Sequence, residues 1–437
     1  MHLILKSQFY TFLEKNGIYS NAEKKLNNSN IATIISLGLA PLLFLSVRSW
    51  TITFLFILIG LSAWQLINLK ITQLKIQSQS GYWVIAALAS PLIAVIAGEI
   101  FRGNLKLSLL DGPTRPFLAV LLFVYLLREK IDFVRLMEWC IPISLLSLGG
   151  LLIVHPYGWA DLGGRFSTTA IDPIALGQYA TFMAFTCLLT FNIYGNDSTP
   201  LKFTKISGFI IGFWISIGSG TRSAWIAVPF LLLLLLVGRL RIRKLKNTPL
   251  IALTFLILGV LLYKISPMVS DRVHLAFNDY SEYFRGINYD TSVGVRLSLL
   301  RVAAHLFLEN PLSGYGDGNY PPLSSLPFAA SFNTNLLENT LIHNGVHNEI
   351  MQNTLRSGIF GLTSSILMFG VPTIIFLRNI DSKISSKRAA SLVGMCYIMS
   401  MFIFGLNIEL FNMKYSISFY ALMISALAAQ VLRPQTV

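Results

Sequence analysis

Two histidine–asparagine pairs stand four residues apart in the segment HNGVHNEIMQNTLRSGIFG, residues 343–361, of a chain with six histidines among 437 residues. Because an imidazole titrates near neutral pH, either histidine is a candidate general base. On a helix, His343 and His347 would share one face, as some zinc ligands do. Asn344 stands where a zinc metalloprotease has glutamate, and no third ligand is obviously placed, so we expect no metal site. Taken alone, His343 is interpreted as a structural histidine.

Five arginines lie beside polar or glycine-containing joints, on the side that the charge pattern makes extracytoplasmic. They are Arg102, Arg115, Arg165, Arg222 and Arg296. A guanidinium group stays charged and donates paired hydrogen bonds, which suits a phosphate. Arg222 lies in GSGTRSAW, residues 218–225, whose small residues allow a phosphate to approach the backbone. We therefore predict an anion site that includes Arg222. Contacts with lipid headgroups or helix ends are the alternative explanation, above all for Arg102 and Arg165.

The elements that must position these groups are membrane helices. The chain is 54% hydrophobic and 12% charged, whereas soluble globular proteins are roughly 25% charged. Apolar runs long enough to cross a bilayer recur along nearly the whole length, separated by short polar joints. Since lipid tolerates only helices or closed barrels, the composition predicts an all-α polytopic membrane protein. Membrane lipids are therefore expected partners.

About twelve transmembrane helices are predicted. Their ranges are 31–47, 51–69, 82–100, 116–127, 133–154, 174–194, 206–220, 223–238, 248–266, 358–377, 389–408 and 415–432. Residues 1–30 carry several charges and no apolar core, so they are interpreted as a cytoplasmic segment and not as a cleavable signal peptide. With the N-terminus inside, the lysine- and arginine-rich joints become cytoplasmic, in agreement with the positive-inside rule.

Residues 267–346 interrupt this pattern, because they are polar and too long for a simple turn. We predict that they form one large periplasmic lobe, partly folded, in which VRLSLLRVAAHLFLEN, residues 295–310, is a helix along the membrane face. The predicted organisation has four parts. They are the cytoplasmic segment 1–30, transmembrane helices 1–9 in 31–266, the lobe 267–346, and the last three spans in 347–437.

Several function classes are disfavoured. The net charge of +14 is spread over many joints and forms no basic stripe with interleaved aromatic residues, so nucleic acid is not an expected partner. Cys140, Cys187 and Cys396 fall within apolar spans, which argues against disulfides or a zinc site. Ionisable groups within the spans, such as Glu99 and Glu138, are few, which disfavours a transporter. The polar residues instead gather at one face and favour chemistry at the periplasmic surface, for which we expect no cofactor.

A longer motif distinguishes His347 from His343, because it fits only the spacing after His347. From His347 the sequence reads His-Asn, nine residues, Gly358, two residues and Gly361. This spacing resembles the signature of the bacterial O-antigen ligase family, whereas counting from His343 puts Thr354 at the first glycine. GSGTRSAW and VGVRLSLLRVAAHLFLENPLSGYGDGNY, residues 293–320, also resemble the family, as do the number of spans and the single lobe.

The resemblance implies a membrane glycosyltransferase of the GT-C type in the bacterial inner membrane, with its active site facing the periplasm. Such an enzyme transfers the O-antigen glycan from undecaprenyl pyrophosphate to a sugar hydroxyl of lipid A-core, with inversion and without a metal. His347 would be the general base. The expected substrate-binding residues are Arg222, Arg115, Arg296, Arg102 and Asn348, with the arginines on the pyrophosphate and Asn348 orienting the site.

The residues named so far are compatible with more than one acceptor substrate. O-antigen polymerases use the same donor, and protein O-oligosaccharyltransferases and proposed small-anion transporters share the architecture. The residues named above serve the ligase and the polymerase equally. The spacing after His347 favours the ligase, and the lack of a large soluble domain disfavours the protein-modifying enzymes.

Overall fold

The computed structural model describes residues 13–14, 16–19, 28–67, 78–103, 106–158, 164–239, 257, 259–261 and 263–434. This part of the chain is helical, with two isolated β-bridges and no strand. Nine helical segments within it are long and apolar enough to cross a membrane. They are α3 (Trp50–Ile67), α4 (Gln79–Arg102), the η2–α5 segment (Leu107–Leu126), α6 (Phe133–Val154), α7 (Pro173–Thr190), α8 (Thr199–Gly218), α14 (Glu349–Asn379), α15 (Ser385–Gly405) and α16 (Lys414–Leu432).

Two shorter apolar helices, α2 (Asn28–Leu43) and α9 (Arg222–Leu234), lie among them. The span expected at 248–266 lies mostly outside the described residues, so the predicted count of twelve stays a prediction. The expected helix 133–154 has the same bounds as α6. By contrast, the expected start at residue 206 is wrong, because α8 begins at Thr199. The cause is Lys205, which lies buried within α8 between the carboxylates of Glu138 and Asp197.

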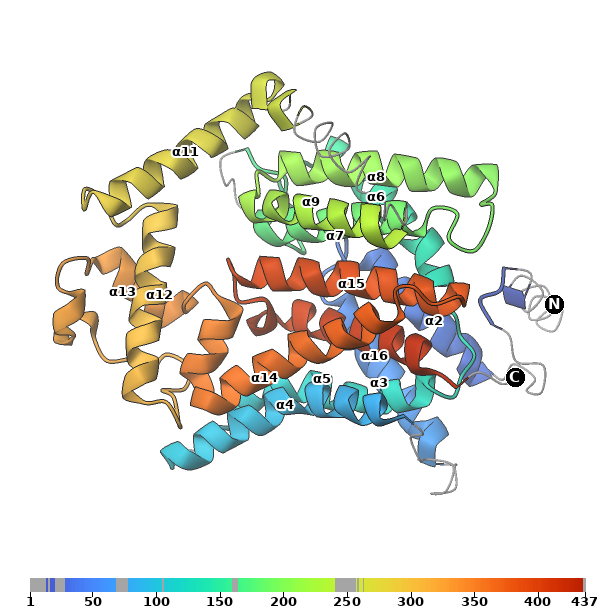
Figure 1. Cartoon of the computed structure of the whole chain (residues 1–437), viewed down its shortest axis with the longest axis horizontal. Coiled ribbons are helices and arrows are strands. Elements are labelled where there is room, and N and C mark those ends of the chain that lie inside the picture. The colour runs from blue at the N-terminus through green and yellow to red at the C-terminus, as the bar shows by residue number, and fades with distance from the viewer. Residues whose placement is uncertain are drawn as a thin grey trace.

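The helices form a bundle with three tiers (Figure 1). α7 and α16 are almost entirely buried and form its core with α15, while α8 packs outside α7 and α4 outside α14. Local sequence sets the helix ends. Before α7, for example, Asp172 Oδ1 accepts hydrogen bonds from the amides of Ile174 and Ala175 at 2.8 and 3.1 Å. Pro173 follows at the first helical position, where its missing N–H has no cost.

The glycines at the end of the histidine motif break α14. Ser357 and Gly358 have non-helical backbone angles, with φ of +59° at Gly358, so the helix turns sharply there. A Cβ on Gly358 would lie 2.4 Å from the Leu312 carbonyl oxygen, and one on Gly361 would lie 1.8 Å from the Asn353 carbonyl oxygen. The start predicted at 358 therefore marks the second half of a longer, broken helix. Both glycines are needed because backbone segments meet closely at the break.

Residues 267–346, the predicted lobe, contain α11 (Pro267–Phe284), α12 (Ser292–Glu309) and α13 (Asn335–Asn344), with the short turns η4 (Leu323–Ser325) and η5 (Pro327–Ala329). They have a small hydrophobic core of their own, to which Leu299, Phe332 and Leu341 belong. The core extends to Val346 and Leu355, which joins it to the start of α14. α12 runs across the end of the bundle, crosswise to the long helices (Figure 1).

Candidate active site

His347 lies in the short connection between α13 and α14, where the backbone turns sharply. Its φ is +53°, and that of Gly345 two residues earlier is +71°. A residue other than glycine rarely adopts this conformation, and such strain often accompanies functional sites. The imidazole of His347 is half-buried, whereas His343 is exposed at the end of α13. The structure therefore gives the two histidines different surroundings, with only His347 in a tightly built loop.

A buried carboxyl group supports this loop. Glu409, from the connection between α15 and α16, accepts a hydrogen bond from the His347 backbone N–H, with an N–O distance of 3.2 Å. A Cβ on Gly345 would lie 2.0 Å from Oε1 of Glu409, so glycine is required there for the carboxyl group to fit. Burial, and next the charge of Glu349, raise the pKa of Glu409 to about 8. Asn412 donates to its other oxygen.

Asn348 shapes the backbone after His347. As the N-cap of α14, its side-chain oxygen accepts a hydrogen bond from the Met351 amide at 3.0 Å, and its side-chain nitrogen donates to the Leu406 carbonyl at 3.4 Å. These bonds fix the start of α14 against the end of α15. The contacts of Asn348 are those of a helix cap, and the orienting role expected for it stays a prediction.

Four arginines from different elements form a group that we call the arginine cluster. It consists of Arg165 from the segment before α7, Arg222 at the start of α9, Arg272 on α11 and Arg296 on α12. Arg165 holds the turn before α9, because it donates to the Ser219 carbonyl at 2.6 Å and to Thr221 Oγ1 at 3.3 Å.

Gly220, in the same turn, has φ of +60° and allows this approach. A Cβ there would lie 3.4 Å from Nε of Arg272 and 3.6 Å from Nε of Arg165. The small residues of GSGTRSAW therefore admit guanidinium groups beside the turn.

Negative charge in the cluster is scarce. Asp279 on α11 faces Arg222, with 3.8 Å between its Oδ2 and Nη1 of Arg222, too long for a hydrogen bond. Nη1 of Arg222 is buried and has no hydrogen-bond partner among the residues that the structure describes. A buried charged donor without an acceptor is costly, so this atom is ready to bind an anion.

Electrostatic coupling connects the cluster with His347. Burial and then the positive charge of Arg222 lower the pKa of Arg296, while Asp279 opposes the shift. Burial and then the charge of Arg296 lower the pKa of His347, so its imidazole is neutral at pH 7 and can accept a proton. Burial and then Arg272 lower the pKa of Arg165 to about 10. These couplings link His347 to Arg296 and Arg296 to Arg222, and the catalytic and binding roles expected for these residues stay predictions.

Arg102 and Arg115 lie elsewhere. α4 and α5, which carry them, are on the opposite side of the bundle from α9 (Figure 1). Arg102 is paired with Glu99 and donates to the Arg356 carbonyl at 2.8 Å. Arg115 is buried, with Nη2 2.9 Å from Asp111. Both therefore have carboxylate partners within their own helices, and no contact in the described part of the chain joins them to the arginine cluster.

The sequence analysis missed two parts of the site. Neither Arg272 nor Glu409 is among the candidate residues that the sequence indicated. A carboxylate in the short joint between the last two apolar helices, NIELFNMK, is the feature that could have drawn attention to Glu409. Among the described residues, no three side chains of His, Cys, Asp or Glu gather as metal ligands.

Fold and site together define a multi-pass helical membrane protein in which the half-buried His347 is electrostatically coupled to a cluster of arginines. Residues 207–366 match the family model described as O-antigen ligase, which assigns this segment to that family and confirms the resemblance. The matched segment contains Arg222, Arg272, Arg296 and His347. An uncharacterized protein of Haemophilus influenzae is 23% identical over 296 residues, which cover 67% of this chain and 72% of that protein.

Proposed function

We propose that the protein is a glycosyltransferase of the O-antigen ligase type. It would transfer the O-antigen glycan from undecaprenyl pyrophosphate to a sugar hydroxyl of lipid A-core, at the periplasmic face of the bacterial inner membrane. The observation that most supports this proposal is the buried Nη1 of Arg222, which lies within the arginine cluster and has no hydrogen-bond partner among the described residues. A pyrophosphate offers several anionic oxygens to such donors, and Arg222 with Arg296 would bind it without a metal.

In the proposed reaction, His347 is the general base. Its imidazole removes the proton of the acceptor hydroxyl as that oxygen attacks the anomeric carbon of the donor. A new glycosidic C–O bond forms, the bond between the anomeric carbon and the phosphate oxygen breaks, and the lipid pyrophosphate leaves with the electron pair. The arginine cluster stabilises the negative charge that develops on the leaving group. Attack opposite the leaving group inverts the anomeric configuration.

Arg102 and Arg115 are secondary candidates for binding the pyrophosphate. Their pairing with Glu99 and Asp111 leaves less charge available for a phosphate than the cluster has. We therefore assign the pyrophosphate to Arg222 and Arg296 first. Transfer is expected to continue in the presence of chelators of divalent metals, which a purified enzyme with both lipid substrates would test.

The experiment that tests the function is deletion of the gene, followed by gel analysis of the glycolipids. Loss of a ligase leaves polymerised glycan on undecaprenyl pyrophosphate and bare lipid A-core. Loss of a polymerase instead gives core that carries a single repeat unit, and a protein O-oligosaccharyltransferase would change glycoproteins. Unchanged glycolipids and glycoproteins with altered uptake of a small anion would favour a transporter and contradict the proposal.

Complementation then tests His347. The His347→Ala variant should reach the membrane in normal amount but restore no glycan transfer, because the acceptor hydroxyl loses its base. His343→Ala is the matched control, since it removes an exposed imidazole four residues away, and it should restore transfer almost fully. Full activity of His347→Ala, or equal loss in both variants, would contradict the assignment.

A further inference from the structure

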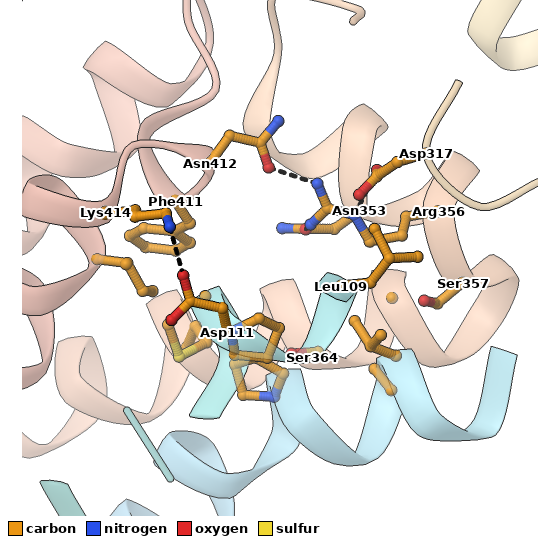
Figure 2. Close-up of a pocket in the computed structure, with 18 of the residues that line it drawn as sticks. Leu109, Asp111, Asp317, Asn353, Arg356, Ser357, Ser364, Phe411, Asn412 and Lys414 are labelled. Carbon is orange, nitrogen blue, oxygen red and sulfur yellow. Dashed lines mark hydrogen bonds and ion pairs between the residues drawn. The ribbon is translucent and has the colours of Figure 1, made fainter. Parts of the chain in front are cut away.

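A cavity of about 270 Å³ lies between α4, the η2–α5 segment, α14 and α16, and no residue of the arginine cluster lines it (Figure 2). Its polar wall contains Asp111, Asp317, Asn353, Arg356, Asn412 and Lys414. The opposite wall is apolar, with Pro91 and Val95 from α4 and Met368 from α14. A concave site with apolar walls and a few convergent polar groups is the usual form of a small-molecule site.

The charges in this cavity are balanced. Lys414 Nζ lies 2.7 Å from Oδ2 of Asp111, and Arg356 Nε lies 2.6 Å from Oδ1 of Asp317. Figure 2 shows the first pair at one side of the cavity and the second pair at the other. Since each cation already has a carboxylate, the cavity has no excess positive charge. In this respect it differs from the arginine cluster, where four arginines are accompanied by Asp279 near Arg222 and Arg296 and by Asp172 near Arg165, and it does not favour an anion.

One polar atom in the cavity wall lacks a partner. Ser357 is 1% exposed, and its Oγ has no hydrogen-bond partner among the described residues. It stands at the break in α14, and its hydroxyl is directed toward the cavity (Figure 2). Buried hydroxyl groups normally form hydrogen bonds, so this one is available to a ligand. A neutral, hydroxyl-rich ligand satisfies this atom and the ion-paired groups without bringing in a net charge.

Hydrogen bonds connect the cavity with His347. Arg356 donates to Asn412 Oδ1, and Asn412 donates to Glu409. Glu409 in turn accepts from the His347 backbone. The loop of His347 therefore rests on the polar wall of the cavity, while the charge of Arg296 reaches its imidazole from the lobe.

We infer that this cavity binds a neutral sugar unit of the acceptor, which makes it a second substrate site beside the arginine cluster. The inference rests on the proposed function, because only a glycan transfer gives this ligand the role of acceptor. An inverting transfer needs the nucleophile and the leaving group on opposite faces of the reacting carbon, so acceptor and donor need separate sites. The two sites have the complementary chemistry for this, with cations for the pyrophosphate and balanced polar groups for the sugar.

A cavity-filling variant tests the inference. Ala94 on α4 is buried and lines the cavity, so Ala94→Phe places a ring into the space. Ala86→Phe is the matched control, since it makes the same change on the same helix at a half-buried position that does not line the cavity. In the purified enzyme, Ala94→Phe should raise the KM for lipid A-core about tenfold or more. The KM for the undecaprenyl-pyrophosphate donor should not change, and Ala86→Phe should change neither.

Binding is measured separately from transfer, so that failure of the proposed function does not hide the result. The probe is core oligosaccharide from which phosphates and acyl chains have been removed, observed by saturation-transfer NMR. Binding to the wild type and Ala86→Phe, with loss in Ala94→Phe and weakening in Ser357→Ala, supports the sugar site even if no transfer is detected. No binding to the wild type, undiminished binding to a folded Ala94→Phe, or selective loss of donor affinity would overturn it. If Ala94→Phe does not fold, unchanged binding in Ser357→Ala is the overturning result.

Discussion

At the scale of single residues, the geometry of a guanidinium group should matter more than its charge. Nη1 of Arg222 lies 3.8 Å from Asp279 Oδ2 and is buried, with no hydrogen-bond acceptor among the described residues. Lysine in its place keeps the charge and loses the planar pair of donors. We expect Arg222→Lys to lower kcat/KM for the donor about tenfold or more, the effect of roughly 1.4 kcal/mol. Arg285→Lys, at an exposed position after α11, is the control and should have little effect. Nearly normal transfer by Arg222→Lys would indicate that Arg222 meets only lipid headgroups.

A second prediction at the scale of single residues concerns Glu409, which we propose as a positioning residue for His347. Glu409→Ala leaves the His347 amide without its acceptor in a strained loop, a loss of about 1–3 kcal/mol. Glu409→Gln keeps an oxygen at that position. We expect alanine to reduce kcat strongly with little change in KM for the donor, and glutamine to restore much of kcat. The assay is initial-rate transfer in purified protein. Equal losses in both variants, or a change in KM alone, would speak against positioning.

At the scale of elements, the break in α14 should be essential for both stability and site geometry. Gly358→Ala introduces a Cβ 2.4 Å from the Leu312 carbonyl oxygen at a φ of +59°. The backbone strain alone costs about 1–3 kcal/mol, so the midpoint of thermal unfolding should fall. Gly370→Ala, in the second half of the same helix with open space around it, should leave the midpoint unchanged or raise it. An unchanged midpoint in Gly358→Ala would mean that the break is not a fixed feature.

The helices also show how much of the fold and of the candidate site could be predicted from the sequence. The bounds of α6 were predicted to the residue and those of α3 and α16 within two residues, because the composition of such helices depends on lipid and not on particular neighbours. The histidine motif pointed to His347 and to the region of the break. Glu409 and the burial of Lys205 escaped prediction, because each depends on which side chains meet across distant segments, and a single sequence does not contain that pairing.

At the scale of the whole molecule, charge and shape divide the bundle into two ends. The lobe covers one end, whereas α16 ends and the α14–α15 connection lies at the other (Figure 1). Basic residues in or next to joints at the second end, such as Arg128, Lys383 and Lys387, favour a cytoplasmic location for it by the positive-inside rule. The residues of the arginine cluster are exceptions to that rule, which the proposed binding of a pyrophosphate would explain. We therefore predict that the lobe and His347 face the periplasm.

Cysteine labelling tests this orientation. Ser324 in the lobe and Ser385 at the start of α15 are exposed, whereas the native Cys187 and Cys396 are buried. In intact spheroplasts, a membrane-impermeant maleimide should label Ser324→Cys, and it should label Ser385→Cys only after lysis. The expected result follows from the donor, since a pyrophosphate headgroup crosses a bilayer only at high cost and must meet Arg222 on the side where transfer occurs. The reverse labelling pattern would place the arginine cluster in the cytoplasm and exclude a periplasmic ligase. Labelling of both variants in sealed spheroplasts would contradict the transmembrane bundle itself.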